Sequence, residues 1–218
     1  MGLAHLSRPG LPGAALVLRA AGVGVPLGLL GAPQAQAGAQ IEEPLSHAVR
    51  TALSAAVADA APPRLQFDRP DERARHQAWL QRAGERLRRY KSEAHTRQEF
   101  LEATWYESRR AGLETELVLG LIQVESAFRK YAISRAGARG YMQVMPFWTR
   151  LIGDGEASRL FHLQTNLRFG CTILRHYLDR ERGDLFMALG RYNGSRGRAP
   201  YPEAVFAARR SWDFGRMP

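Results

Sequence analysis

Apolar residues recur at helical spacing along much of the chain, and the apolar–polar alternation typical of half-buried strands is almost absent. The densest apolar run covers residues 117–124, LVLGLIQV, and is too short to cross a bilayer. Just before it, Glu114, Thr115 and Glu116 supply a cap-forming residue and negative charge, which stabilise the start of a helix. This pattern predicts a helix that is buried on most of its circumference.

Other segments repeat the helical pattern, with turn-forming residues between them. We expect helices at residues 41–61, 71–90, 100–111 and 166–180, and one more that is capped by Asp184. Two adjacent prolines predict a linker at residues 61–69. The glycines of residues 153–157 predict a loop there. The chain is therefore predicted to be mainly α, with little or no β structure.

A single carboxylate, Glu125, ends the densest apolar run. Burying an unpaired charge is costly, so this position needs an explanation. Either the helix end frays, so that Glu125 faces water or pairs with Arg129, or apolar neighbours raise its pKa and it stays a proton donor. The run alone leaves both possibilities open.

Three motifs appear in order from Glu125 onward. The first is Glu-Ser-x-aromatic, at residues 125–128. The second is a loop of the pattern Ala-x-Ser-x-x-Gly-Ala-x-Gly that is followed, at Met142, by Met-Gln-x-Met-Pro. The third is Tyr-Asn-Gly, at residues 192–194. Over about residues 100–206, these motifs resemble the catalytic domain of the soluble lytic transglycosylases, relatives of goose-type lysozyme.

The resemblance implies a lysozyme-like helical domain at residues 95–218, preceded by an N-terminal helical extension and linker at residues 38–94. It also implies cleavage of the β-1,4 bond between N-acetylmuramic acid and N-acetylglucosamine, with formation of a 1,6-anhydromuramoyl product. Glu125 would be the single acid and base, because the sugar's own 6-hydroxyl replaces a second carboxylate.

The same resemblance assigns roles around Glu125. Tyr192 would hydrogen-bond or orient the acid, Ser134 and Gln143 would contact the sugar, and Met142 and Met145 would line the cleft. Asn193, in the same block as Tyr192, completes the substrate-binding group and is expected mainly to hold its loop.

The chain departs from the family pattern beside these positions. Tyr141 replaces the usual Leu before Met-Gln, Arg191 replaces the usual Ala before Tyr192, and Gly194 follows Asn193 without a spacer. These departures leave the glycan preference open. Two alternative functions also stay open at this point: a lysozyme-type hydrolase of the same bond, and a non-catalytic peptidoglycan-binding or secretion-accessory protein.

Residues 1–37 have the pattern of an export signal. Arg8 and Arg19 supply positive charge, residues 20–32 form an uncharged apolar run, and Ala35-Gln36-Ala37 is a small-x-small cleavage site. No cysteine lies near that site, so a lipid anchor is not expected. We expect an exported, soluble, periplasmic protein without a stable membrane anchor.

The positive charge of the chain limits the classes of partner that it is expected to bind. The net charge is +10 and the pI about 10.6, which suits nucleic acid, an anionic membrane or an anionic polymer such as peptidoglycan. The export signal speaks against nucleic acid, so we expect peptidoglycan strands, with a cell-envelope or secretion complex as a further partner left open.

The chain offers little for metal or thiol chemistry. Cys171, the single cysteine, shares a helical stripe with Leu167 and Leu174, which favours a core residue over a nucleophile. The six histidines show no metal-ligand spacing, and we expect neither a metal nor a cofactor.

Overall fold

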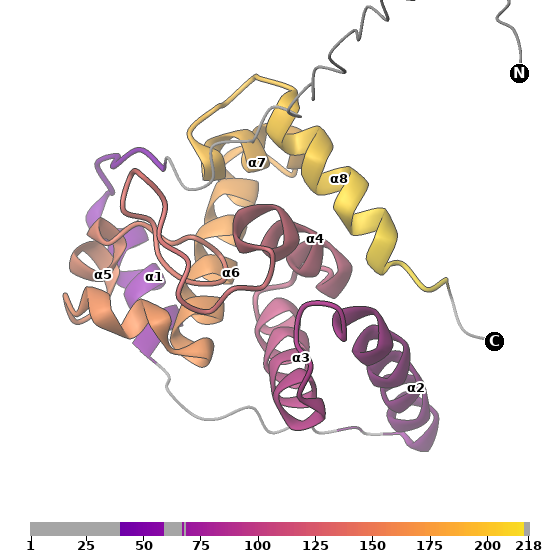
Figure 1. Cartoon of the computed structure of the whole chain (residues 1–218). Helices are drawn as coiled ribbons and strands as arrows, with labels where there is room; N and C mark the ends of the chain where they lie inside the picture. The colour runs from indigo at the N-terminus through magenta and orange to yellow at the C-terminus, as the bar shows by residue number, and fades with distance from the viewer. Residues whose placement is uncertain (1–39, 59–66, 68, 216–218) are drawn as a thin grey trace, which may run out of the picture. The chain divides into compact units, whose positions relative to one another are not determined.

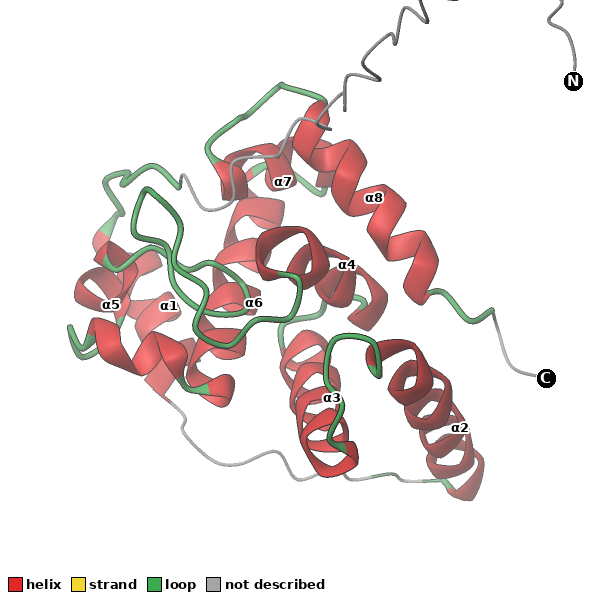
Figure 2. Ribbon diagram, in the orientation of Figure 1, coloured by secondary structure: helices red, strands yellow, loops and turns green. Residues whose placement is uncertain are grey.

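A computed structural model describes residues 40–58, 67 and 69–215, which all belong to one unit of the chain, Gln34–Pro218. The described residues form helices and loops and contain no strand (Figures 1 and 2). The helices are α1 (His47–Ala58), α2 (Pro70–Leu87), α3 (Ala94–Arg110), α4 (Thr115–Ser126), α5 (Phe147–Ile152), the 3-10 helix η1 (Ala157–Phe161), α6 (Leu163–Arg180), α7 (Leu185–Asn193) and α8 (Pro200–Trp212). The prediction of a mainly α chain is confirmed. The predicted export signal lies outside the described residues.

Helix α4 forms the centre of the core, as its apolar run predicts. Leu119, Leu121 and Ile122 are fully buried, so neighbours surround the helix on most sides. Helix α8 packs along α4, and Gly120 permits this close approach. A Cβ atom at Gly120 would lie 2.6 Å from the backbone nitrogen of Arg209 in α8. The contact between α4 and α8 therefore depends on a position without a side chain.

The loop between α4 and α5, residues 127–146, carries the second motif and is held by hydrogen bonds. Two isolated bridges, Ile133 with Arg139 and Arg139 with Val144, fold it back on itself. Asn166 of α6 accepts a hydrogen bond of 2.8 Å from the backbone nitrogen of Met142 and donates to the carbonyl of Arg139 at 2.9 Å. The start of α6 thus fixes the loop from behind.

The helix expected at residues 41–61 begins later than predicted. Helix α1 starts at His47, and residues 41–46 are not helical. Pro44 explains the difference, because its ring excludes helical backbone in the residue before it and removes an amide donor. Ser46 then provides the start, since its Oγ accepts a hydrogen bond of 3.3 Å from the backbone nitrogen of Val49.

The other predicted helices are present, with small shifts at their ends. In α2, Trp79, Ala83 and Leu87 are buried on one face. The side chain of Asp184 caps α7 by accepting a hydrogen bond of 3.0 Å from the backbone nitrogen of Met187, as predicted. Cys171 is 1% exposed, which confirms it as a core residue. Most of the linker expected at residues 61–69 lies outside the described residues.

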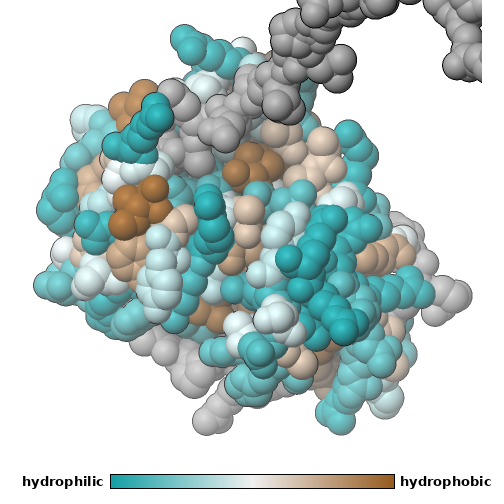
Figure 3. Space-filling view, in the orientation of Figure 1, coloured by the Kyte–Doolittle hydropathy of each residue, from teal (hydrophilic) through white to brown (hydrophobic). Residues whose placement is uncertain are grey.

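The surface drawn in Figure 3 is mostly hydrophilic, with hydrophobic residues in separate small patches. Three large hydrophobic side chains among the described residues are strongly exposed: Ile41, Tyr131 and Ile133. Two of them lie in the loop that follows α4, and Ile41 lies in the segment before α1. Among the described helices, none has the length and apolar composition needed to span a membrane.

Candidate active site

Glu125 lies in the last turn of α4 with its side chain enclosed. Only 4% of its surface is exposed. The Tyr201 hydroxyl donates a hydrogen bond of 2.5 Å to Oε1 of Glu125. The other oxygen, Oε2, is buried and has no hydrogen-bond partner among the described residues. A buried polar atom without a partner is rare in folded proteins and marks a site that a ligand can complete.

Burial sets the protonation state of this carboxyl. Desolvation raises the pKa of Glu125 to about 8, although the hydrogen bond from Tyr201 lowers it in part. At neutral pH the carboxyl is therefore mainly protonated, and the hydrogen bond at Oε1 leaves Oε2 to carry the proton. Of the two possibilities left open by the sequence, the raised pKa is confirmed. A pairing with Arg129 does not occur, because Arg129 Nε donates to the carbonyl of Ser126 at 3.0 Å.

The chain turns sharply after Glu125. Ala127 and Phe128 both have left-handed backbone, with φ of 48° and 62°. Left-handed backbone is uncommon for residues with side chains and often marks functional sites. Phe128 is buried against Phe100 and Trp212, which secures the turn. The aromatic residue of the first motif thus ends α4 directly behind Glu125.

Two tyrosines lie near Glu125, and the hydrogen bond expected from Tyr192 comes from Tyr201. Tyr192 is fully buried and its hydroxyl donates instead to the carbonyl of Met142 at 2.8 Å. A hydroxyl has one proton to donate, so Tyr192 holds the loop while Tyr201 holds the acid. Sequence reasoning missed this role of Tyr201. Tyr201 lies in the first turn of α8, a helix that was not predicted from the sequence.

Ser134 and Gln143 hold the loop of residues 127–146. Ser134 Oγ accepts a hydrogen bond of 3.1 Å from the backbone nitrogen of Ala138. Gln143 is 1% exposed, and its Nε2 donates to the carbonyls of Ala132 at 3.1 Å and Gly140 at 2.9 Å. The amide nitrogen of Gln143 is therefore engaged within the loop. A sugar contact of either residue stays a prediction.

The two methionines differ in their surroundings. Met142 is fully buried against Cys171 and Gly170, where a Cβ would collide with the Met142 side chain. The prediction that Met142 lines a cleft is wrong, because small residues in α6 admit it into the core. Met145 is partly exposed, and its place in a cleft stays a prediction. Asn193 donates from Nδ2 to Ser195 Oγ at 3.1 Å, and so holds its own loop.

A residue from a distant part of the chain completes this arrangement. Gln40 is 4% exposed, and its carboxamide bridges two backbone groups of the second motif. Its Nε2 donates to the carbonyl of Gln143 at 3.4 Å, and its Oε1 accepts from the backbone nitrogen of Met145 at 3.3 Å. Burial and the nearby Glu125 raise the pKa of Tyr192.

The family model described as Transglycosylase SLT domain matches residues 103–208, which include all three motifs, Glu125 and Tyr201. Over residues 103–208 the chain is therefore similar to the transglycosylase SLT family.

Individual relatives of this SLT domain match over shorter stretches. A membrane-bound lytic murein transglycosylase C of Actinobacillus pleuropneumoniae is 46% identical over 75 residues, which are 31% of this chain and 20% of the relative. The protein of the same name from Histophilus somni is 38% identical over 103 residues, or 40% of this chain and 28% of the relative. The chain thus spans a fifth to about a quarter of the length of these relatives.

A solved structure also resembles the chain. It is that of an inactive mutant of lytic transglycosylase Slt from Pseudomonas aeruginosa, with 19% identity and a TM-score of 0.41. The similarity covers 65% of this chain and 27% of the other.

Two departures of this SLT domain from the family pattern have visible partners. The hydroxyl of Tyr141 accepts a hydrogen bond of 3.0 Å from Lys91. Arg191, which stands directly before Tyr192, forms ion pairs with Glu43 at 2.8 Å and Glu181 at 2.5 Å. Each departure therefore connects the SLT domain to a charged group on another segment.

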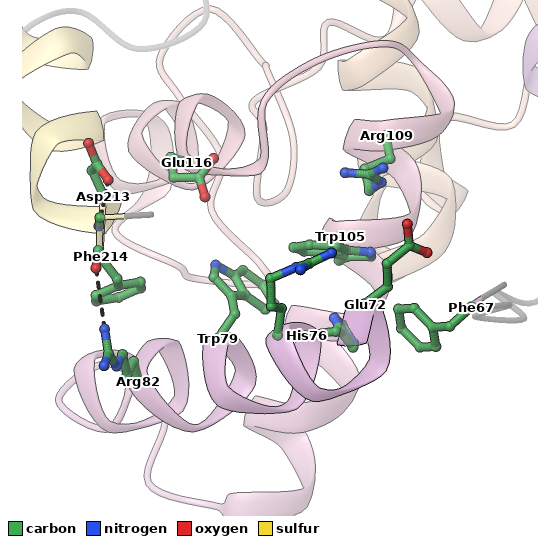
Figure 4. Close-up of a pocket in the computed structure, with 12 residues that line it drawn as sticks. Phe67, Glu72, His76, Trp79, Arg82, Trp105, Arg109, Glu116, Asp213 and Phe214 are labelled. Carbon is green, nitrogen blue, oxygen red and sulfur yellow. Dashed lines mark hydrogen bonds between the residues drawn. The ribbon is translucent and has the colours of Figure 1, made fainter. Parts of the chain in front are cut away.

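A separate cavity of about 350 Å³ lies at the opposite end of α4 (Figure 4). Its floor is a cluster of aromatic rings in which His76 packs on Trp79 and Trp105. Glu116, at the start of α4, faces this cavity, whereas Glu125 does not line it. Its rings pack α2 on α3, so we regard it as part of the support of the SLT domain and place the active site at Glu125.

Proposed function

We propose that this SLT domain is a peptidoglycan lytic transglycosylase with Glu125 as its single acid and base. The observation that carries the proposal is a buried carboxyl with a pKa of about 8, held by Tyr201 at one oxygen and free at the other. A proton donor that works near neutral pH needs a pKa in this range. The match of residues 103–208 to the transglycosylase SLT family model supports the reaction class.

The reaction follows from a protonated Glu125. The carboxyl gives its proton to the glycosidic oxygen as the bond from that oxygen to C1 of N-acetylmuramic acid breaks. The 6-hydroxyl of the same sugar then bonds to C1, and the Glu125 carboxylate takes the proton that this hydroxyl releases. No water is consumed, the products are a 1,6-anhydro end and a free N-acetylglucosamine 4-hydroxyl, and Glu125 ends protonated as it began.

The surroundings of Glu125 support an attack from within the sugar. Burial and the Tyr201 hydrogen bond account for its pKa shift, and no second carboxylate of the described chain contributes to it. The aspartates nearest in sequence to the motifs have other partners: Asp154 pairs with Arg159, Asp179 pairs with Arg175, and Asp184 caps α7. Glycosidases that use water normally need two carboxylates, whereas an intramolecular hydroxyl gains from its high effective concentration.

The contacts of Gln40 support a place for the sugar. A carboxamide and an acetamido group offer the same chemistry, one carbonyl acceptor and one N–H donor. The carbonyl of Gln143 accepts a hydrogen bond from the Gln40 carboxamide, and the backbone nitrogen of Met145 donates one to it. We infer that they receive an acetamido group of the substrate beside Glu125.

Product analysis on purified sacculi tests the proposal. Wild-type protein should release muropeptides with anhydro ends, which are lighter by one water than reducing ends. Glu125→Gln should lower turnover by at least about 10³-fold, because the variant has no acidic proton to give. Glycan binding should persist in this variant.

Other outcomes would select an alternative. Reducing ends in the products would show a lysozyme-type hydrolase. Binding without turnover by the wild-type protein would show a non-catalytic peptidoglycan-binding or secretion-accessory protein. Full activity of Glu125→Gln would contradict the assignment of the acid.

We also propose that the protein is exported to the periplasm, where peptidoglycan lies. The support is the sequence of residues 1–37, with its charged, apolar and small-x-small segments in order. Cell fractionation of a tagged full chain should recover a shortened product beginning near Gly38 in the periplasmic fraction.

A further inference from the structure

Residues 40–45, here called the strap, lead from the carboxamide of Gln40 to the start of α1. The strap is not helical, and it is the indigo segment that precedes α1 in Figure 1. Ile41 is 61% exposed, whereas Gln40 is 4% exposed. Hydrophobic burial therefore does not hold Ile41, and the polar side chain of Gln40 is the one that is enclosed. This inversion of the usual pattern indicates that Gln40 occupies a specific polar seat.

The seat lies in the loop that Ser126, the residue after Glu125, holds by donating a hydrogen bond of 2.7 Å to the carbonyl of Tyr141. The Gln40 carboxamide lies between the carbonyl of Gln143 and the backbone nitrogen of Met145. The Tyr192 hydroxyl donates a hydrogen bond of 2.8 Å to the carbonyl of Met142, the residue directly before Gln143. A carboxamide in this position makes the pair of hydrogen bonds that the acetamido group of an amino sugar would make with the same backbone groups.

Ion pairs hold the strap three residues further on. Glu43 pairs with Arg191 at 2.8 Å and with Arg180. Arg191 directly precedes Tyr192 in α7, and the Tyr192 hydroxyl bonds to the carbonyl of Met142, so the anchor lies one residue from a contact of the loop that forms the seat. The Glu43 side chain is 28% exposed and that of Arg191 18%, so solvent screens this pair only in part.

We propose that the strap is a built-in competitor of the substrate. Gln40 occupies the acetamido seat, Glu43 keeps it close, and a glycan strand must displace Gln40 before Glu125 can act. The proposal rests on the proposed function of the Glu125 site. It also gives Arg191, one of the departures from the family pattern, a role as the partner of Glu43.

The geometry favours displacement over permanent closure. The two hydrogen bonds of the Gln40 carboxamide measure 3.3 and 3.4 Å, beyond the usual range for N–H···O bonds. The ion pair between Glu43 and Arg191 is shorter, at 2.8 Å. It keeps the Gln40 carboxamide near the seat and so raises the local concentration of the carboxamide there. If the seat is filled in about nine molecules of ten, the apparent affinity for a competing ligand falls about tenfold.

Three variants of the full chain test the strap. Gln40→Ala empties the seat, Glu43→Gln loosens the anchor, and Glu42→Gln is the matched control. Glu42→Gln removes the same charge from the same segment as Glu43→Gln. The partner of Glu42 is Arg150, at 3.8 Å, which is not part of the seat. The probe is N,N′,N″-triacetylchitotriose, whose affinity is measured by titration calorimetry, with cellotriose as a sugar that lacks acetamido groups.

Gln40→Ala should bind triacetylchitotriose about five- to tenfold more tightly than the wild type, with a matching fall in KM on sacculi and an unchanged kcat. Glu43→Gln should shift both values in the same direction by a smaller factor. Glu42→Gln should equal the wild type, and no variant should gain affinity for cellotriose. Glu43→Gln keeps the test valid if Gln40→Ala does not fold.

Unchanged or weaker binding of triacetylchitotriose by both Gln40→Ala and Glu43→Gln would overturn the strap, whether or not anhydro products form. Tighter binding by these variants without anhydro products from any of them would overturn the lytic reaction and leave the strap in place. The two proposals therefore fail separately.

Discussion

At the scale of single residues, the site depends on keeping one carboxyl protonated. Apolar neighbours and burial raise the pKa of Glu125, and Tyr201 partly opposes them. Both effects arise from residues that also pack the core, because Tyr201 is 2% exposed and hydrogen-bonds only the acid in the described chain. Stability and acidity are therefore linked at this position.

The first prediction concerns stability. Below pH 4.5, the ordinary pKa of glutamate, Glu125 is protonated in both the folded and the unfolded chain. Between pH 4.5 and about 8 only the unfolded chain releases the proton, so the wild type loses stability as pH rises. At pH 7 this loss is on the order of 3 kcal/mol, at about 1.4 kcal/mol per pH unit. Glu125→Gln should escape it, so its advantage over the wild type in urea unfolding should be larger at pH 7 than at pH 4.

The second prediction concerns Tyr201. The activity of the wild type should fall above about pH 8, where Glu125 loses its proton. Tyr201→Phe removes a hydrogen bond that favours the carboxylate, so it should move this alkaline limb of kcat/KM to higher pH. Tyr192→Phe is the control, because Tyr192 donates to Met142 and not to Glu125. A limb that moves in Tyr192→Phe and stays in place in Tyr201→Phe would reverse the roles given to the two tyrosines.

At the scale of elements, the contact between α4 and α8 brings the acid and its tyrosine together. Glu125 stands near the end of α4 and Tyr201 near the start of α8, so the spacing of these helices sets their hydrogen bond. Gly120 lies in the interior of α4 against the backbone of α8. A change at this contact should therefore reach the site without touching it.

Gly120→Ala tests this coupling. The added methyl group would lie 2.6 Å from the Arg209 nitrogen and 2.8 Å from its Cα, so the helices must separate. We expect a loss of about 1–3 kcal/mol in the free energy of unfolding, together with lower kcat/KM. Gly84→Ala in α2 is the matched control, since nothing lies within 4 Å of its added Cβ. That variant should gain about 0.5–1 kcal/mol, because alanine favours the helix.

How far the sequence predicts the structure depends on the distance between interacting residues. The helices follow from apolar residues that are neighbours along the chain, whereas the apolar run alone leaves the burial of Glu125 open. The partner of Glu125 is 76 residues away and Gln40 is 103 residues from Gln143, so no local pattern reports either contact. The non-helical residues 41–46 show the same limit. The alanine-rich residues after them predicted one continuous helix, but Pro44 and the contacts of Gln40 and Glu43 keep residues 41–46 out of α1.

At the scale of the whole molecule, the net charge of +10 acts on long polymers more than on single sugars. Peptidoglycan stems carry carboxylates, whereas a chitooligosaccharide is neutral. Many of the arginines in the described chain are exposed, so salt should screen their attraction for the polymer.

The fourth prediction follows from this contrast. Raising salt from about 0.1 to about 1 M shortens the screening length from about 10 Å to about 3 Å. Binding to sacculi, measured by co-sedimentation, should weaken at least tenfold over this range. Binding of triacetylchitotriose should change little, because its contacts are hydrogen bonds at the seat. Equal salt dependence of the two would show that the charge has no part in substrate binding.

The burial of Cys171 gives this protein a built-in reporter. It is the single thiol of the chain, it packs on Met142 behind the loop of residues 127–146, and burial raises its pKa well above the ordinary value. A thiol reagent can reach it only when α6 and that loop part. The labelling rate of the unmodified protein therefore measures how often the wall behind Glu125 opens, without any engineered probe.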